Sequence, residues 1–378
     1  MYLVPPRRRR SRTPRVILLL LVDAALIWGV YTLFTVRPSW TRPFDPTPTP
    51  TRSAASFADE GDQRYRDGKF DKAIAAYDAA LQLEPARADV MAKLARLLAW
   101  EGKSQQAVAQ ARSAVELEPD NALYLGTLCM ALDWDKQIDE ALKYCLKAIE
   151  ADEGLPEAYA FLAEAYADKG RIDKADEAIQ KALELDGQSE LVHRNAGYVL
   201  EVQGKYRAAI AEYQKAIEIH PRLVDLYLGV ARNYQRLEDY DKALENFKKA
   251  QAISPTNPRV LDQLGWAYYA NEEYERAVTT FEGALKVDPN FTSAYAHLGV
   301  TQYVQRNYEG AIANFEKAIE LGMDSVEYYY ELGLSYVYLD QCDKGLPWLK
   351  RALEIDPSAE PAQQGLSICA GRQKKGTK

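Results

Sequence analysis

A small residue recurs every 34 residues through most of this 378-residue chain. Seven residues before each recurrence stands another small residue, which is Ala73 in the first unit and Gly345 in the last. A third small position, such as Gly61 or Gly265, lies twelve residues earlier again. A period that stays in phase over nine units predicts an array of repeats and not a series of separate globular domains. The recurring residue itself is alanine throughout: Ala80, Ala114, Ala148, Ala182, Ala216, Ala250, Ala284, Ala318 and Ala352.

Each unit contains two apolar helical patterns separated by a short polar turn. In one unit, Leu298 and Gly299 belong to the first pattern, and Ala311 and Phe315 belong to the second. Small residues at a helix crossing let two antiparallel helices approach closely. One helix pair cannot bury its apolar face alone, but stacked pairs can, so the sequence predicts an all-α solenoid. The nine predicted units are residues 54–87, 88–121, 122–155, 156–189, 190–223, 224–257, 258–291, 292–325 and 326–359.

The residue types within a unit resemble the tetratricopeptide repeat, in which L-G-x-x-Y is followed by A-x-x-x-F and then by proline. The resemblance covers about four fifths of the chain. It implies a right-handed α-solenoid of nine helix-turn-helix repeats over residues 54–359. We expect residues 360–378 to add a capping helix containing Leu366 and Ile368, followed by a basic tail. The unit 258–291 matches the family pattern with Leu264, Gly265, Tyr268, Ala277, Phe281, Ala284 and Pro289.

The first 53 residues differ from the repeats in composition. Residues 1–15 include six arginines, and residues 16–36 contain one charged residue, Asp23. A helix of about 20 apolar residues spans a bilayer, so we expect a transmembrane helix at 16–36. The apolar run is longer than in a cleaved signal peptide and no small-x-small site follows it, which favours an uncleaved anchor. The arginines predict a cytoplasmic N-terminus, and the Pro/Thr-rich residues 37–53 predict an extended linker to extracytoplasmic repeats.

The net charge of −8 is unevenly distributed. Residues 1–53 contain nine arginines and two aspartates and carry +7, so the remainder carries −15. Such an acidic body repels phosphate backbones, and we expect no nucleic-acid partner. His193, His220 and His297 are too far apart in sequence for a local metal site, and no catalytic or phosphate-loop motif is present. We therefore expect no enzymatic activity, no metal, no cofactor and no small-molecule substrate.

The family resemblance implies a partner-binding groove. In tetratricopeptide repeat proteins, positions 2, 5, 9, 12 and 13 of each first helix line a concave surface that binds peptides. Here this stripe is aromatic in the last three units and contains arginines and tryptophans in earlier ones, so we expect a protein or peptide partner. The alternative is that these side chains pack between neighbouring first helices as ordinary core. The candidate partner-binding residues are Arg96, Trp100, Trp134, Arg232, Arg236, Trp266, Tyr269, Val300, Tyr303, Tyr330, Leu334 and Tyr338.

The four cysteines form two candidate pairs. Cys129 and Cys145 occupy two core positions of one unit, and Cys342 of the last unit precedes Cys369 of the final helix. If the repeats are exported, both pairs are candidate disulfides. The alternative is four buried thiols that act as small hydrophobic side chains.

These features predict a single-pass membrane protein, anchored by residues 16–36, that presents a protein-interaction scaffold. The alternative function is a regulatory or targeting subunit that docks an enzyme, a transferase or a protease, encoded elsewhere. The two functions differ only in the partner, which a repeat family does not identify.

Overall fold

The computed structural model describes the backbone of residues 13–35 and 52–376. The chain divides into two units, Met1–Arg52 and Ser53–Lys378. Most of the predicted basic segment 1–15 and of the predicted linker 37–53 lies outside the described residues. In the first unit, helix α1 (Thr13–Thr35) covers most of the predicted membrane segment. Within the described ranges, no helix is both long enough and apolar enough to cross a membrane.

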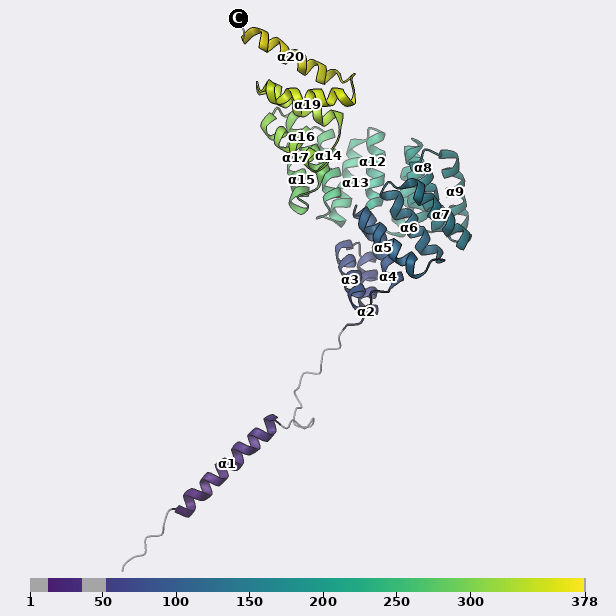
Figure 1. Cartoon of the computed structure of the whole chain (residues 1–378). Coiled ribbons are helices and arrows are strands. Elements are labelled where there is room, and N and C mark those ends of the chain that lie inside the picture. Colours follow the sequence, from purple (N-terminus) through teal and green to yellow (C-terminus); the bar gives the residue numbers. More distant parts are fainter. Residues whose placement is uncertain (1–12, 36–51, 377–378) are drawn as a thin grey trace, which may run out of the picture. The chain divides into compact units, whose positions relative to one another are not determined.

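The described residues form twenty α-helices, which confirms the predicted all-α fold (Figure 1). Helices α2 to α19 form nine antiparallel pairs, and α20 (Glu360–Gly376) follows the ninth pair. The first helices of the pairs are α2 (Ala54–Arg66), α4 (Ala88–Trp100), α6 (Ala122–Trp134), α8 (Pro156–Asp168), α10 (Glu190–Val202), α12 (Val224–Arg236), α14 (Pro258–Ala270), α16 (Thr292–Val304) and α18 (Val326–Tyr338). The second helices are α3 (Phe70–Leu83), α5 (Ser104–Leu117), α7 (Ile138–Ala151), α9 (Ile172–Leu185), α11 (Tyr206–Ile219), α13 (Tyr240–Ile253), α15 (Tyr274–Val287), α17 (Tyr308–Glu320) and α19 (Cys342–Ile355).

A turn of three residues joins the two helices of each pair, and its middle residue has a positive φ. At Gly102 this angle is 79°, in the left-handed region that glycine adopts without steric cost. The Lys103 N–H then donates to the Leu98 carbonyl at 2.8 Å, which satisfies an unpaired carbonyl at the end of α4. The nine middle residues are Gly68, Gly102, Lys136, Gly170, Gly204, Glu238, Glu272, Arg306 and Asp340.

Small and large side chains meet where the helices of a pair cross. A Cβ atom added at Gly265 would lie 2.6 Å from the Phe281 ring, so glycine at this position lets the ring reach the backbone of α14. The same arrangement joins Gly299 to Phe315, where the distance would be 2.7 Å. Both phenylalanine rings are fully buried. The small positions predicted from the sequence therefore make room for the largest core side chains of the second helices.

The third pair has a disulfide at this crossing. Cys129 of α6 and Cys145 of α7 take the positions that glycine and phenylalanine hold elsewhere, and they are bonded to each other. A second disulfide joins Cys342 of α19 to Cys369 of α20. Of the two alternatives for the cysteines, the structure therefore has the disulfides. Disulfides that close loops of 16 and 27 residues each stabilise the folded chain by about 3–4 kcal/mol in the chain-entropy model.

Helix α20 packs against α18 and α19. Ala362 and Cys369 are buried there, and Leu366 packs against the same cluster. Ile368 is 36% exposed, so the prediction that it covers the ninth pair is wrong. The reason is that its neighbour Cys369 faces α19, and consecutive residues of a helix point about 100° apart.

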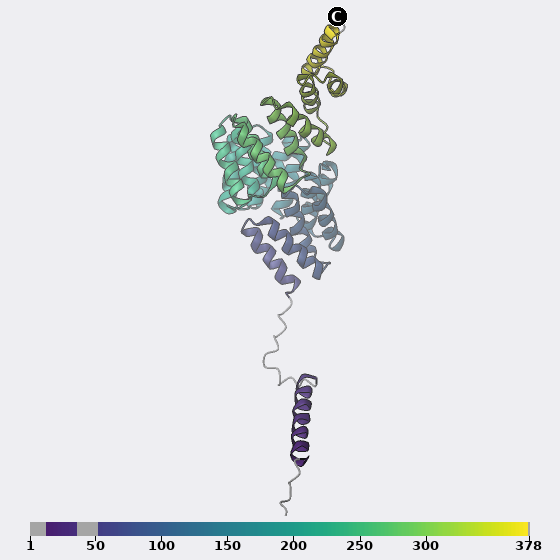
Figure 2. The same ribbon diagram turned by 90° about the vertical axis from the view of Figure 1, so that its left-hand side faces the viewer.

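The stack of nine pairs curves strongly, as Figures 1 and 2 show from two directions. The curvature brings the sixth and seventh pairs back to the first two pairs, where hydrogen bonds join residues more than 150 positions apart. The handedness of this curvature stays a prediction.

Candidate partner-binding surface

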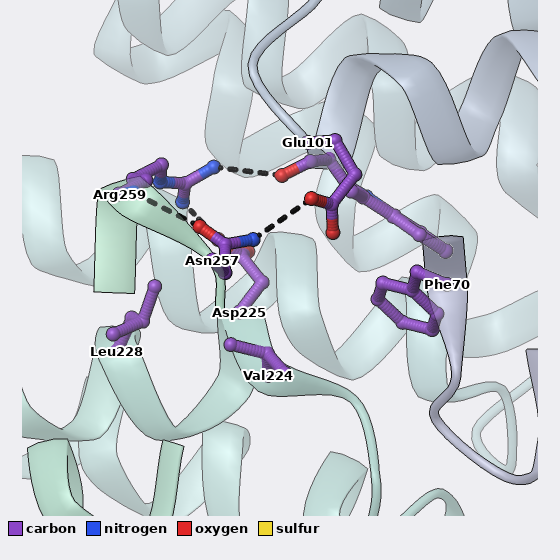
Figure 3. Close-up of a pocket in the computed structure, with 8 residues that line it drawn as sticks. Phe70, Glu101, Val224, Asp225, Leu228, Asn257 and Arg259 are labelled. Atoms are coloured by element: carbon purple, nitrogen blue, oxygen red, sulfur yellow. Dashed lines mark hydrogen bonds and ion pairs between the residues drawn. The ribbon is translucent and has the colours of Figure 1, made fainter. Parts of the chain in front are cut away.

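The end of α4 contacts the start of α14, across five repeats. Asn257 Nδ2 donates to Glu101 Oε2 at 2.9 Å, and Arg259 Nη1 donates to the Trp100 carbonyl at 3.1 Å (Figure 3). The cavity that remains between these residues and Phe70 is about 10 Å³, which is room for a single water molecule. The two ends of this contact are therefore closely packed.

A second set of contacts lies beside the first. Arg222 Nη1 donates to the Asp67 carbonyl at 3.1 Å, and the Tyr65 and His220 rings meet edge to face at 5.0 Å. A Cβ atom added at Gly68 would lie 2.8 Å from the Arg222 carbonyl oxygen, so the backbones themselves touch. We call these two sets together the closing contact, because they complete one closed turn of the solenoid.

A cluster of charged residues lines a cavity of about 230 Å³ on the inside of this turn. Arg194 of α10 donates to Glu164 of α8 at 2.5 Å and to Asp225 of α12 at 3.1 Å. Its guanidinium lies 5.0 Å from the Trp134 ring, whose Nε1 donates to Glu164 at 3.0 Å. Although burial opposes it, the positive charges of Arg194 and Arg259 lower the pKa of Asp225 below its usual range. Most of these charges therefore pair with one another across four repeats. Asp133 of α6 is the exception, because its Oδ1 atom is buried without a hydrogen-bond donor, and burial and then the negative charge of Glu164 raise its pKa to about 8.

The predicted arginines of the early repeats have three different environments. Arg232 pairs with Glu201 at 3.0 Å, within the closed turn. Arg96 lines a cavity of about 220 Å³ together with Tyr65 and Trp100. Arg236 is exposed at the end of α12. Of the five residues predicted here, four (Arg96, Trp100, Trp134 and Arg232) thus belong to the closed turn.

The last three pairs present aromatic rings along their first helices. The rings of Trp266 and Tyr269 stack at 4.6 Å, and those of Tyr303 and Tyr338 lie 6.3 Å apart. Tyr338 is 44% exposed, whereas Val300 and Leu334 are buried below the rings at 8% and 6%. We call this the aromatic surface; it consists of Trp266, Tyr269, Val300, Tyr303, Tyr330, Leu334 and Tyr338.

Two further tyrosines extend the aromatic surface. Tyr274 and Tyr308 begin α15 and α17, and their rings lie 5.7 Å from Tyr269 and 4.9 Å from Tyr338, respectively. Sequence reasoning missed them because it considered only the first helix of each unit. A signal was present, since tyrosine recurs at this position in four consecutive units as Tyr206, Tyr240, Tyr274 and Tyr308.

Sequence models described as tetratricopeptide repeat match most of the chain. One matches residues 64–128, 135–194 and 234–299, which together make up about half of the chain. A second matches residues 188–256, and a third matches residues 301–360. A comparison with curated proteins found no match.

Solved structures share the fold at low sequence identity. A crystal structure of the APC/C hetero-tetramer Cut9–Hcn1 has a TM-score of 0.55 at 18% identity and covers 82% of this chain. The present chain spans 55% of the length of that chain. The human IFIT1 dimer with m7Gppp-AAAA has a TM-score of 0.52 at 19% identity, covering 89% of this chain and 79% of that chain. Pseudomonas aeruginosa pilF has a TM-score of 0.51 at 20% identity, covering 57% and 98%.

Proposed function

Because this chain belongs to the tetratricopeptide repeat family, we propose that it is a protein-interaction scaffold whose aromatic surface holds a segment of a partner protein. The family membership makes a protein or peptide partner the expected ligand. It does not identify that partner.

The continuity of the aromatic surface is the observation that carries this proposal. The rings of Trp266 and Tyr269 stack within the seventh pair, and the Tyr303 ring of the eighth pair lies 6.3 Å from the Tyr338 ring of the ninth. Trp266, Tyr269 and Tyr303 also pack against one hydrophobic cluster that contains the buried Val300, which joins the seventh pair to the eighth. Large, partly exposed aromatic side chains supply most of the binding free energy in many protein interfaces. The inner face of the earlier repeats is different, because Arg194 pairs with Glu164 and Asp225 there and the first two repeats engage the closing contact.

A partner that is itself an enzyme remains the alternative function. In that case the chain is a regulatory or targeting subunit that docks a transferase or a protease encoded elsewhere. The same surface serves both functions, so the identity of the captured protein distinguishes them.

We also propose that residues 16–36 tether the scaffold to a membrane, with the repeats outside the cytoplasm. The sequence supports this, because 20 of these 21 residues are uncharged and six arginines precede them. Apolar side chains of α1 such as Leu20 and Trp28 are 63% and 70% exposed, and apolar area of this kind is typical of a surface that contacts a membrane or another protein. The two disulfides support an oxidising compartment. Protease digestion of the repeats in intact cells tests this topology.

Polar substitution of the aromatic surface tests the proposed function. The full-length variant Trp266→Ser/Tyr303→Ser/Tyr330→Ser should lose at least one partner that the wild type captures from an extract of the source cells. Loss of three anchor rings typically weakens an interface by several kcal/mol. The measurement is quantitative mass spectrometry of the captured proteins, with circular dichroism to verify that the helical content persists.

A matched control replaces exposed apolar residues of the second helices, in the variant Leu83→Ser/Leu146→Ser/Tyr240→Ser. These three side chains are 49%, 51% and 42% exposed and lie outside the aromatic surface. The control should capture the same proteins as the wild type. If both variants capture the wild-type set, the aromatic surface is not the docking site.

A further inference from the structure

Glu331, in the first helix of the ninth pair, is a carboxylate without a counter-charge. Its Oε2 atom is buried and accepts no hydrogen bond, and no cation contributes to its electrostatic environment in the described part of the chain. Burial, and then the negative charge of Glu327, raise the pKa of Glu331 to about 7. Glu331 is partly buried, and a buried carboxylate oxygen such as Oε2 normally has a hydrogen-bond donor, so Oε2 has room for an external one.

The charge of this carboxylate acts on tyrosines of the seventh and ninth pairs. The pKa of Tyr269, Tyr328 and Tyr330 is raised first by burial and then by the negative charge of Glu331. Their rings therefore lie within electrostatic reach of the carboxylate, although Tyr269 comes from the seventh pair and the other two from the ninth.

These rings belong to one packed group. Trp266, Tyr269, Tyr303 and Tyr328 all pack against the hydrophobic cluster that contains Val300. The aromatic surface and the unpaired carboxylate are thus parts of the same site, and not two separate features of the array.

The neighbouring helices leave this site negatively charged. The charged groups near it are Glu327 on the same helix and Asp262 on α14, and Asp262 already pairs with the His297 Nδ1 atom of α16 at 2.8 Å. Two repeats before Glu331, at the equivalent position, the buried Gln263 Oε1 also lacks a hydrogen-bond donor. The site therefore presents acceptors and aromatic faces with no cation of its own.

We propose that Glu331 and the surrounding rings form a subsite for a basic side chain, arginine or lysine, of the partner segment. The inference rests on the proposed function and names the chemistry that the partner must carry. The N–H groups of a guanidinium or ammonium would donate to the carboxylate, while its charge lies against the tyrosine and tryptophan faces. An acidic or purely apolar segment would leave the Glu331 Oε2 atom without a hydrogen-bond donor.

Peptide display on the full-length protein tests this inference. Peptides selected by the wild type should share arginine or lysine next to apolar residues. For one selected peptide, Glu331→Gln should raise the Kd about tenfold or more, and replacing the basic residue of the peptide by norleucine should have the same effect. Because the two changes remove one interaction, combining them should add little.

The control is Glu327→Gln, which removes an exposed carboxylate one turn earlier on the same helix and should change the Kd less than threefold. Glu331→Asp keeps the charge and should keep the preference for basic peptides. Selection of peptides without a basic residue, or an unchanged Kd in Glu331→Gln, overturns the subsite and leaves the scaffold function standing. Selection of no peptide at all overturns both.

Discussion

At the scale of single residues, the contact between a small and a large side chain fixes the distance between the helices of a pair. The small position in α14 is Gly265, and its ring partner is Phe281 of α15. The sequence predicts this pair, because both residues recur at fixed positions in successive units. It does not predict the role of Glu331, since nothing in the spacing distinguishes an unpaired carboxylate from the many solvated ones.

Two glycine substitutions in the same repeat should have opposite effects on stability. Gly265→Ala forces a methyl group into the Phe281 ring and should lower the free energy of unfolding by about 1–3 kcal/mol. Gly283→Ala places its methyl 3.9 Å from Leu261, an ordinary contact, and should raise that free energy by up to about 1 kcal/mol, because alanine favours the helix. Urea unfolding of the two variants measures both. A Gly265→Ala variant that is as stable as the wild type or more so would show that the crossing is not tightly packed.

At the scale of elements, the closing contact joins turns and not helix faces. The turn after α4 meets the residues that precede and begin α14, and Glu101 is partly buried in that contact. Burial, and then the negative charge of Asp71, raise the pKa of Glu101 to about 7, although Lys103 and Arg259 oppose this. A carboxyl with a raised pKa binds its proton more tightly in the closed arrangement than in an open one, so the contact is sensitive to pH.

The stability contributed by this contact should fall with rising pH. It is fully present below about pH 4.5, the ordinary pKa of the carboxyl, and is lost as the pH rises through about 7. The rise in the Glu101 pKa from 4.5 to about 7 corresponds to a loss of about 3 kcal/mol in the free energy of unfolding over this pH range. Glu101→Gln, which is neutral and still accepts from Asn257, should therefore exceed the wild type in stability at pH 8 and match it near pH 4.5.

Urea unfolding at several pH values measures this difference. The control is Glu116→Gln, which changes an exposed carboxylate of α5 and should show no such trend. A difference between wild type and Glu101→Gln that is constant from pH 4.5 to pH 8 would contradict the assignment of the pH dependence to the closing contact.

At the scale of the whole molecule, the sequence predicts the local pairing of helices but not the closure. Each helix pair follows from a 34-residue pattern, and the rings of Tyr269 and Tyr303 pack against one cluster because equivalent residues of successive repeats are neighbours. The contact of Trp100 with Arg259 depends on a small rotation that accumulates over five repeats. The pattern of a single unit does not reveal this accumulated rotation. The sequence therefore predicts one continuous groove, in which residues of the closed turn are grouped with those of the aromatic surface.

The proposed topology is a prediction at this scale. Protease added to intact cells should digest the repeats of the full-length protein while a cytoplasmic marker stays whole, because positively charged residues before a membrane segment remain inside. The four cysteines should resist thiol labelling until a reductant is added. Protection of the repeats, with digestion only after lysis, would reverse the orientation.

The closing contact also determines how the array responds to a pulling force. A stack in which each pair touches only its neighbours behaves as a spring that stretches evenly. Here, Arg222 and Arg259 tie the coils of the first seven pairs together, so tension between Ser53 and α20 extends the eighth and ninth pairs first. These are the repeats that carry Tyr303 and Tyr330. Tension therefore reaches the part of the aromatic surface on the eighth and ninth pairs before it reaches the closed turn of the first seven pairs.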